Sequence, residues 1–183
     1  MKDKIKDYSL HFFKDIIPVV AGILIALFID NWNSDRKDKN YVEQVYSTID
    51  SELNDSKEDI KTTIPKHKSL IDSIELNLNN DNYSILDIVM KAGGINIPQI
   101  KNNAWRSISS FKIDLVDYNK LSLLSSIDDD KLNLNKKADF LMNYIYSNIN
   151  AKDKNSKATL KLIVLDIIQT ENTIQRKIDL FNN

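Results

Sequence analysis

The longest uninterrupted run of apolar residues lies near the start of the chain. Residues 16–29 read IIPVVAGILIALFI, contain no charged side chain, and are followed by a strongly polar stretch. Extended from Leu10 to Trp32, the segment would form about 34 Å of α-helix, enough to cross the roughly 30 Å apolar core of a bilayer. The pattern predicts a transmembrane helix over residues 16–32. A buried core helix is the alternative that the length of the run leaves open.

Polar and aromatic residues at both ends of this segment match two membrane–water interfaces. Lys14 can extend its ammonium group toward lipid headgroups, and Trp32 can anchor the opposite end beside Asp30. We therefore expect Lys14, Asp30 and Trp32 to be interface anchors. A cleaved signal peptide is the competing interpretation, but no small-residue cleavage site follows the run, which favours an uncleaved signal anchor. Gly22 and Ala26 form a small-xxx-small pair that would let two such helices approach closely.

Residues 1–15 form a basic and weakly amphipathic tail before the span. Its apolar residues Ile5, Tyr8 and Phe12 lie at helical spacing among lysines, which fits either a short interfacial helix or a charged tail without fixed structure. Asp15 is expected to cap a helix that begins at Ile16. Pro18 then falls in the first turn, where proline is tolerated.

Beyond the span, residues 33–183 are predicted to form a helical domain. The first apolar stripe at helical spacing consists of Tyr41, Val45, Ile49, Leu53, Ile60 and Ile64. It predicts that the membrane helix continues into a stalk helix over residues 33–64, which Pro65 kinks or ends. Residues 65–183 are then expected to form an antiparallel helix bundle.

Turn residues divide the predicted bundle into segments. A loop is expected over Asn77–Asn82, and Ser84 should cap a short helix over Ile85–Lys91 that Gly93-Gly94 ends. The stretch from Ile95 to Pro98 is predicted to be a non-helical connector. Asn102 or Asn103 should cap the next helix, which carries Trp105 and Ile108.

Two longer amphipathic helices are predicted in the last third of the chain. The first, from about Val116 to Asn150, directs inward Leu121, Leu124, Ile127, Leu134, Leu141, Met142, Ile145 and Ile149. The run Asp128–Asp130 is expected to interrupt it. The second directs inward Leu160, Val164, Ile167, Ile174, Ile178 and Phe181. Helices of this kind with short loops are typical of a bundle.

Composition supports an all-α fold and narrows the function. Three glycines and three prolines give few turns for a β fold. Basic and acidic residues number 25 and 26 and are well mixed. The sequence therefore has no basic tract that would predict binding to nucleic acid, and it has no acidic tail. The chain has no cysteine, which excludes disulfides and thiolate chemistry.

The polar motifs predict no catalytic, cofactor-binding or metal-binding residue. His11 lies beside the predicted membrane boundary, and His67 has no acidic or histidine neighbour in the sequence. Both are expected to be solvated. Asp128–Asp130 resembles the start of a calcium loop, but Asn133 stands where the glycine is needed. Gly93-Gly94 lacks the other residues of a phosphate-binding loop. We therefore expect a protein that is not an enzyme, with Trp105 a core residue rather than a ligand platform.

The stretch VVAGILIALFIDNWNSDRK (Val19–Lys37), followed by an acidic helix with Asp50-Ser51-Glu52-Leu53, resembles the start of a family of uncharacterised bacterial membrane proteins. Members open with a basic tail, a Gly-Ile-x-Ile-Ala-Leu span, an Asn-Trp-Asn junction and an Arg-rich helical start. Asp30 and a single Arg36 depart from that pattern. A looser likeness covers Lys91–Ile97 and Asn103–Trp105. The resemblance implies a single-pass protein with a helical domain, and no activity.

These observations predict a non-enzymatic, membrane-anchored component of the bacterial cell envelope, acting as a scaffold or accessory subunit. The expected partners are the lipid bilayer and another protein or a second copy of the chain. A sensory domain that binds a small ligand between its helices and signals through a partner is the alternative. Basic residues near the span are almost balanced, and long domains translocate largely regardless of charge. Residues 33–183 are therefore expected on the extracytoplasmic side of the inner membrane.

Overall fold

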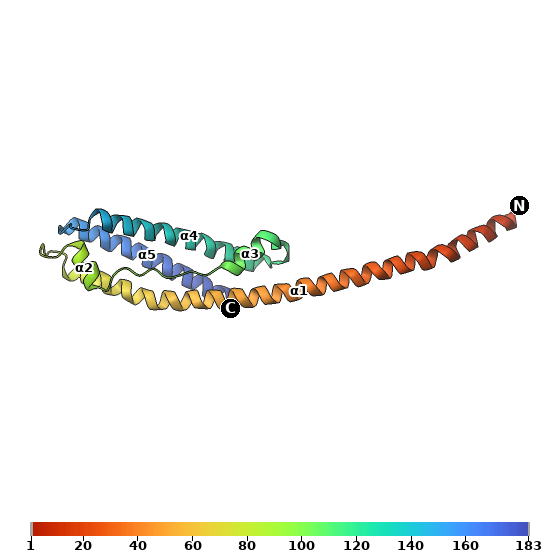
Figure 1. Ribbon diagram of the computed structural model, residues 1–183, viewed down its shortest axis with the longest axis horizontal. Coiled ribbons are helices and arrows are strands. Elements are labelled where there is room, and N and C mark those ends of the chain that lie inside the picture. Colours follow the sequence, from red (N-terminus) through yellow and green to blue (C-terminus); the bar gives the residue numbers. More distant parts are fainter. Residues whose placement is uncertain (1, 183) are drawn as a thin grey trace. The chain divides into compact units, whose positions relative to one another are not determined.

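The computed structural model describes residues 2–182, and within them the side chains of Lys14 and of residues 16–182. The described chain is all-α and contains no strand, which confirms the predicted fold class. Its elements are α1 (Lys2–Leu76), α2 (Ile85–Lys91), α3 (Asn103–Phe111), the 3-10 helix η1 (Ile113–Leu115), α4 (Tyr118–Ser147) and α5 (Lys154–Phe181) (Figure 1). The chain divides into two compact units, Met1–Gln44 and Val45–Asn183.

The first unit consists of the helical residues of α1 up to Gln44. The helix already includes Asp15, so the predicted helix start at Ile16 with an Asp15 cap is wrong. Pro18 therefore lies inside the helix, where it leaves one backbone carbonyl without its usual donor. Lys14, which carries that carbonyl, is exposed. The expected amphipathic character of residues 1–15 concerns side chains that, apart from Lys14, lie outside the described residues.

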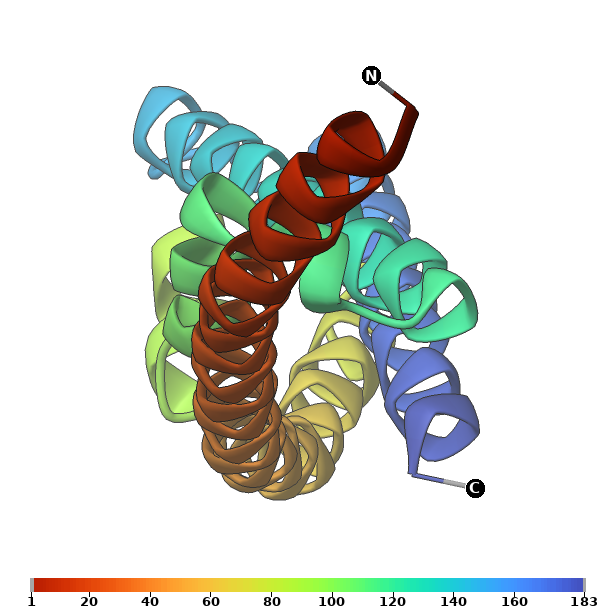
Figure 2. The same cartoon turned by 90° about the vertical axis from the view of Figure 1, so that its right-hand side faces the viewer.

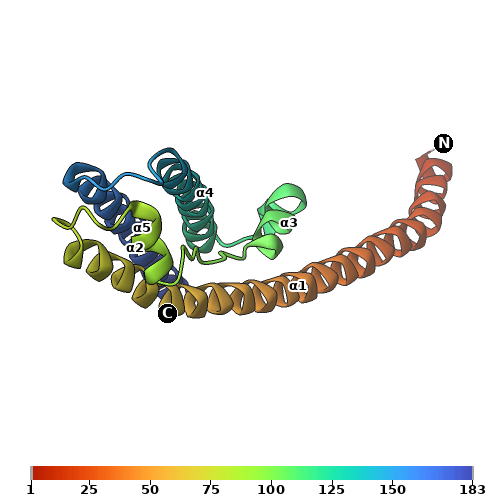
Figure 3. The same ribbon diagram turned by 60° about the vertical axis from the view of Figure 1, so that its left-hand side comes forward.

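The second unit contains three long helices: α1 from Val45 onward, α4 and α5. Ion pairs fix their directions: Lys57–Asp179 and Glu75–Lys161 join α1 to α5, and Lys137–Asp166 and Asp130–Lys177 join α4 to α5. In each set the residue numbers rise on one helix and fall on the other, so α5 is antiparallel to both α1 and α4. The helices α1 and α4 are therefore parallel, and the chain crosses between them through α2, α3 and η1 (Figures 1 and 3).

Aliphatic side chains from these three helices form the core of the second unit. The predicted inward residues that are buried are Ile49, Leu53 and Ile60 on α1, Leu124, Ile127, Leu134, Leu141 and Ile145 on α4, and Leu160, Val164, Ile167, Ile174, Ile178 and Phe181 on α5. Each such side chain contributes about 1.5–3 kcal/mol when fully buried. The end-on view places α2 and α3 on one side of the unit and α5 on the other (Figure 2).

Pro65 does not end the first long helix, because α1 continues to Leu76. A proline inside a helix costs about 3 kcal/mol through its missing donor and its steric clash. Burial of Ile60, Leu70 and Ile74 on both sides of Pro65 offsets this cost, and Pro65 itself is exposed. The compact unit thus begins at Val45, earlier than the bundle start predicted at residue 65.

Asp128–Asp130 does not interrupt α4, which is continuous from Tyr118 to Ser147. The expected break assumed that three adjacent carboxylates would remain solvated. Asp128 instead accepts a hydrogen bond from the amide of Asn102, and Asp130 pairs with Lys177 at 2.5 Å. Partners on neighbouring elements therefore stabilise these carboxylates within the helix.

The predicted short helix and its ends are confirmed. Ser84 and Asp87 form a capping box at the start of α2, with Ser84 N–H donating to Asp87 Oδ2 at 2.9 Å. Gly93 and Gly94, with φ of 89° and 86°, follow the last turn in the left-handed region that glycine adopts without strain. Asn102 occupies the N-cap position of α3 but makes no capping bond with its side chain.

Candidate functional site

An extended segment between α2 and α3 lies along one face of α1 and is the most unusual feature of the second unit (Figure 3). This connector comprises residues 95–102, and none of its residues is helical. Pro98, Ile100 and Asn102 are buried in it. Because an extended segment has no internal hydrogen bonds, its backbone donors and acceptors need partners from elsewhere.

Polar side chains of α1 supply those partners. Gln99 N–H donates to Asp59 Oδ2 at 2.6 Å, and Lys101 N–H donates to Ser56 Oγ at 2.8 Å. Successive residues of an extended chain point in opposite directions, so amides 99 and 101 face the same side. Just beyond the connector, Ala104 N–H donates to Glu52 Oε2 at 3.0 Å. The α1 residues lie three or four apart and thus form one polar stripe.

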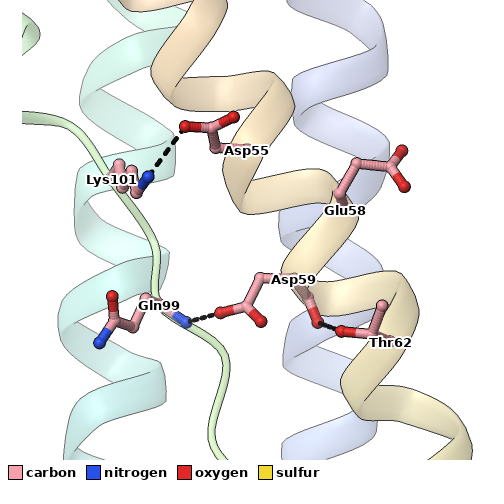
Figure 4. A pocket seen from close by; sticks show the side chains of 6 residues that line it. All are labelled: Asp55, Glu58, Asp59, Thr62, Gln99 and Lys101. Carbon is pink, nitrogen blue, oxygen red and sulfur yellow. Dashed lines mark hydrogen bonds and ion pairs between the residues drawn. The ribbon is translucent and has the colours of Figure 1, made fainter.

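A hollow beside the connector is lined by Asp55, Glu58, Asp59, Thr62, Gln99 and Lys101 (Figure 4). Its carboxylates already have partners within the chain. Asp55 pairs with Lys101 at 2.8 Å and raises the pKa of that amine through the hydrogen bond, whereas Glu58 pairs with Lys61 at 2.5 Å. Within the described residues no group of three or more histidine, aspartate or glutamate side chains could hold a metal ion. The hollow is therefore part of how α1 holds the connector.

The connector also contacts a buried histidine. His67 on α1 is 2 % exposed, and its Nε2 lies 2.5 Å from the carbonyl oxygen of Asn96. Its Nδ1 lies 3.2 Å from Oε2 of Glu171 on α5, which is fully buried. The prediction that His67 is solvated is therefore wrong. Its acidic partner is 104 residues away in the sequence, so local sequence gives no sign of the contact.

A signal for this pair does exist in the two apolar stripes. On α5, position 171 continues the spacing of Val164, Ile167 and Ile174, and on α1 position 67 continues that of Ile60 and Ile74. A polar residue at an inward position of an amphipathic helix needs a buried partner. Two such residues on different helices are candidates to be partners of each other.

Opposing effects set the protonation of His67. Burial lowers the pKa of its imidazole because it disfavours the charged ring. The hydrogen bond and negative charge of Glu171, with the Asn96 carbonyl, outweigh burial, so the pKa of His67 is raised above its usual value. Glu171 Oε1 is buried and has no hydrogen-bond partner among the described residues.

A second buried charge lies at the end of α1. Lys157 on α5 is 0 % exposed, and its ammonium group donates to the carbonyl oxygens of Asn77 at 3.0 Å and Asn80 at 2.8 Å. The last carbonyls of a helix lack intrahelical donors and carry the negative end of its dipole. Lys157 thus caps the end of α1 from another helix, a role that the sequence analysis did not predict.

The other predicted site residues lie in different places. Lys14, Asp30 and Trp32 are exposed in the first unit, as are Gly22 and Ala26, and no other atom would lie within 4 Å of a Cβ at Gly22. The side chain of His11 lies outside the described residues.

Trp105 is confirmed as a core residue. It is 5 % exposed and lies with Ile49, Leu53, Leu124 and Ile127 around a narrow gap between α1, α3 and α4. Glu52, Lys101 and Asn102 also border the gap, which leaves no space for a water molecule. The arrangement indicates packing between helices rather than a platform for a ligand.

One helix among the described residues is long and apolar enough to cross a membrane. It lies near the N-terminus, its most apolar window has a mean hydropathy of 1.8, and none of that window is buried. Comparison of the chain with protein-family models, curated proteins and solved structures finds no match.

Proposed function

We propose that this protein is a non-enzymatic, membrane-anchored component of the bacterial cell envelope that acts as a scaffold or accessory subunit. The observation that carries the proposal is the contrast between the two units. Every large apolar side chain from Ile16 to Trp32 is exposed, from 38 % at Ile16 to 72 % at Phe28, whereas the second unit buries its long apolar stripes. Apolar surface of this extent is unfavourable in water, and a bilayer would cover it.

The second unit supports a role in contacts with proteins. Its core is filled by aliphatic side chains, and the carboxylates in the hollow beside the connector have partners within the chain. No observation specifically favours a small ligand between its helices, so we do not develop the sensory alternative. The resemblance to bacterial single-pass proteins is consistent with the proposal and implies no activity.

In bacteria that express the full chain, we expect the protein to remain in the membrane fraction after a carbonate wash. After mild cross-linking of those membranes, it should migrate with a second protein or a second copy of itself. A Leu24→Lys variant should reduce membrane retention, because a charge near the middle of a span costs about 2.5–3.5 kcal/mol of insertion free energy. Fractionation, immunoblotting and mass spectrometry of the cross-linked species measure these effects.

The matched control is Leu162→Lys, since Leu162 lies on α5 in the second unit and is 65 % exposed. This variant should stay in the membrane fraction like the parent. Recovery of the parent chain in the soluble fraction would contradict the membrane anchor. A carbonate-resistant monomer that retains a small molecule would instead favour the sensory alternative.

We further propose that residues 33–183 face the extracytoplasmic side of the inner membrane. Near the span, Lys2, Lys4, Lys6 and Lys14 precede it and Arg36, Lys37 and Lys39 follow it, an almost even balance that leaves translocation of a long domain possible. A reporter enzyme that is active only outside the cytoplasm, fused after Asn183, should be active. The same fusion without residues 1–32 should show no reporter activity. If the full-length fusion is present at its normal level but shows no reporter activity, residues 33–183 face the cytoplasm and the proposed orientation is wrong.

A further inference from the structure

We propose that His67, Glu171 and the carbonyl oxygen of Asn96 form a proton-binding site, and that its bound proton holds the connector against α1. The proposal concerns the second unit and does not depend on the membrane anchor. It rests on the atoms that surround the two nitrogens of the imidazole ring.

Both ring nitrogens of His67 face hydrogen-bond acceptors. Nδ1 lies 3.2 Å from a carboxylate oxygen of Glu171, and Nε2 lies 2.5 Å from the Asn96 carbonyl. A neutral imidazole carries one N–H and can satisfy only one of these contacts. Two arrangements satisfy both: an imidazolium beside a carboxylate, or a neutral ring that donates from Nε2 beside a protonated Glu171. Both contain one proton more than a neutral ring beside a carboxylate.

Loss of that proton breaks one of the two contacts. A lone pair of the ring then faces either the Glu171 carboxylate or the Asn96 carbonyl, and the contact that has lost its proton becomes repulsive. Glu171 is 0 % exposed and its Oε1 has no described partner, so the remaining N–H is most favourably directed to this buried charge. The contact that opens is therefore the one to Asn96, which lies on the half-buried connector.

The charged groups near His67 act in opposite directions on its proton, and the effect of Glu171 outweighs that of Lys66. From α5, Glu171 favours the protonated ring, whereas Lys66 on α1 opposes it. The connector contributes the Asn96 carbonyl, and Lys66 Nζ also donates to Asn96 Oδ1 at 3.3 Å. From α4, Lys137 is paired with Asp166 at 2.7 Å and also donates to Thr170.

Because the pKa of His67 is raised in the folded chain, the proton stabilises the fold fully below the usual imidazole pKa. This stabilisation is lost as the pH rises through the folded-state pKa. The connector is thus held while the site is protonated, and its N-terminal half is released as the pH rises through the folded-state pKa. Its C-terminal half keeps the hydrogen bonds that it donates to Asp59 and Ser56, so the opening is confined to the part near Asn96.

The test is nuclear magnetic resonance of the full chain in lipid nanodiscs, with a His11→Gln background that leaves His67 as the sole histidine. Below the usual imidazole pKa of about 6.5, we expect protons on both ring nitrogens of His67, or a single Nε2 proton beside a protonated Glu171. The additional proton should be lost only above the midpoint of a free imidazole. The methyl resonances of Ile95 and Ile97, on the connector, should shift with the same midpoint, and that of Ile127 in the core should not.

Two glutamate variants distinguish a specific effect of Glu171 on the His67 midpoint from a general effect of removing negative charge. Glu171→Gln should lower the His67 midpoint by about one pH unit or more, a tenfold or greater loss of proton affinity. Glu75→Gln, which removes a half-exposed carboxylate paired with Lys161, should leave the midpoint unchanged.

Three results overturn the proposal: a singly protonated ring beside an ionised Glu171 at a pH below the usual imidazole pKa of about 6.5, a midpoint of the site at or below that of a free imidazole, or connector methyls that do not follow the titration. The first two of these results are measured on a chain that keeps His67 and Glu171. They therefore decide the question even if Glu171→Gln fails to fold.

Discussion

Replacing Ile174 with aspartate is expected to unfold the second unit. Ile174 is 0 % exposed and lies in the α5 stripe between Ile167 and Ile178. A carboxylate at this position would be fully buried, and burying a charge without a partner costs several kcal/mol. Because domains of this size are stable by only about 5–15 kcal/mol, the variant should lose its cooperative thermal transition in circular dichroism.

The matched control is Leu162→Asp on the same helix. Leu162 is 65 % exposed, so its replacement should change the unfolding midpoint by no more than a few degrees, as is usual for exposed positions. If the Ile174→Asp chain melts like the parent, the assignment of the α5 stripe to the core is wrong.

Replacing Lys157 with methionine should destabilise the second unit by about 2–5 kcal/mol, because the carbonyls of Asn77 and Asn80 at the end of α1 lose charged hydrogen bonds and keep only backbone donors. Methionine keeps the length of the side chain, so lost packing contributes little. For a unit of this size the unfolding midpoint should fall by about 10 °C. Thermal denaturation followed by circular dichroism measures the shift.

Lys154→Met provides the comparison for this effect. Lys154 is exposed in the first turn of α5, where a positive charge is slightly unfavourable because of the helix dipole. Its removal should leave the midpoint unchanged or raise it slightly. Equal melting of the two variants would show that Lys157 does not stabilise the end of α1.

Features that depend on neighbouring residues were predictable from the sequence. The Ser84 cap, the glycine pair after α2 and the inward stripe of α5 each follow from local backbone preference or from helical spacing. Burial of Trp105 was also predictable, because large aromatic side chains are usually core residues in bundles.

Features that depend on distant residues were not predictable from the sequence. Pro65 lies within a helix because apolar contacts on both sides offset its cost, and Asp128 and Asp130 are tolerated because partners lie on other elements. His67 and Lys157 were missed for the same reason, since each is satisfied by groups far away in the sequence. Sequence patterns indicate which positions face inward, but they do not indicate which buried polar groups meet.

The parallel arrangement of α1 and α4 has a consequence for the order in which the domain assembles during synthesis. The hairpin of α4 and α5 is local and can close as soon as both helices exist. The inward face of α1, by contrast, is made early, and part of it stays uncovered until the ribosome has reached α5, which carries Glu171 and Lys157. Throughout that interval the nascent chain presents an apolar stripe next to its predicted membrane segment, the condition under which a chaperone or the bilayer surface competes with native packing.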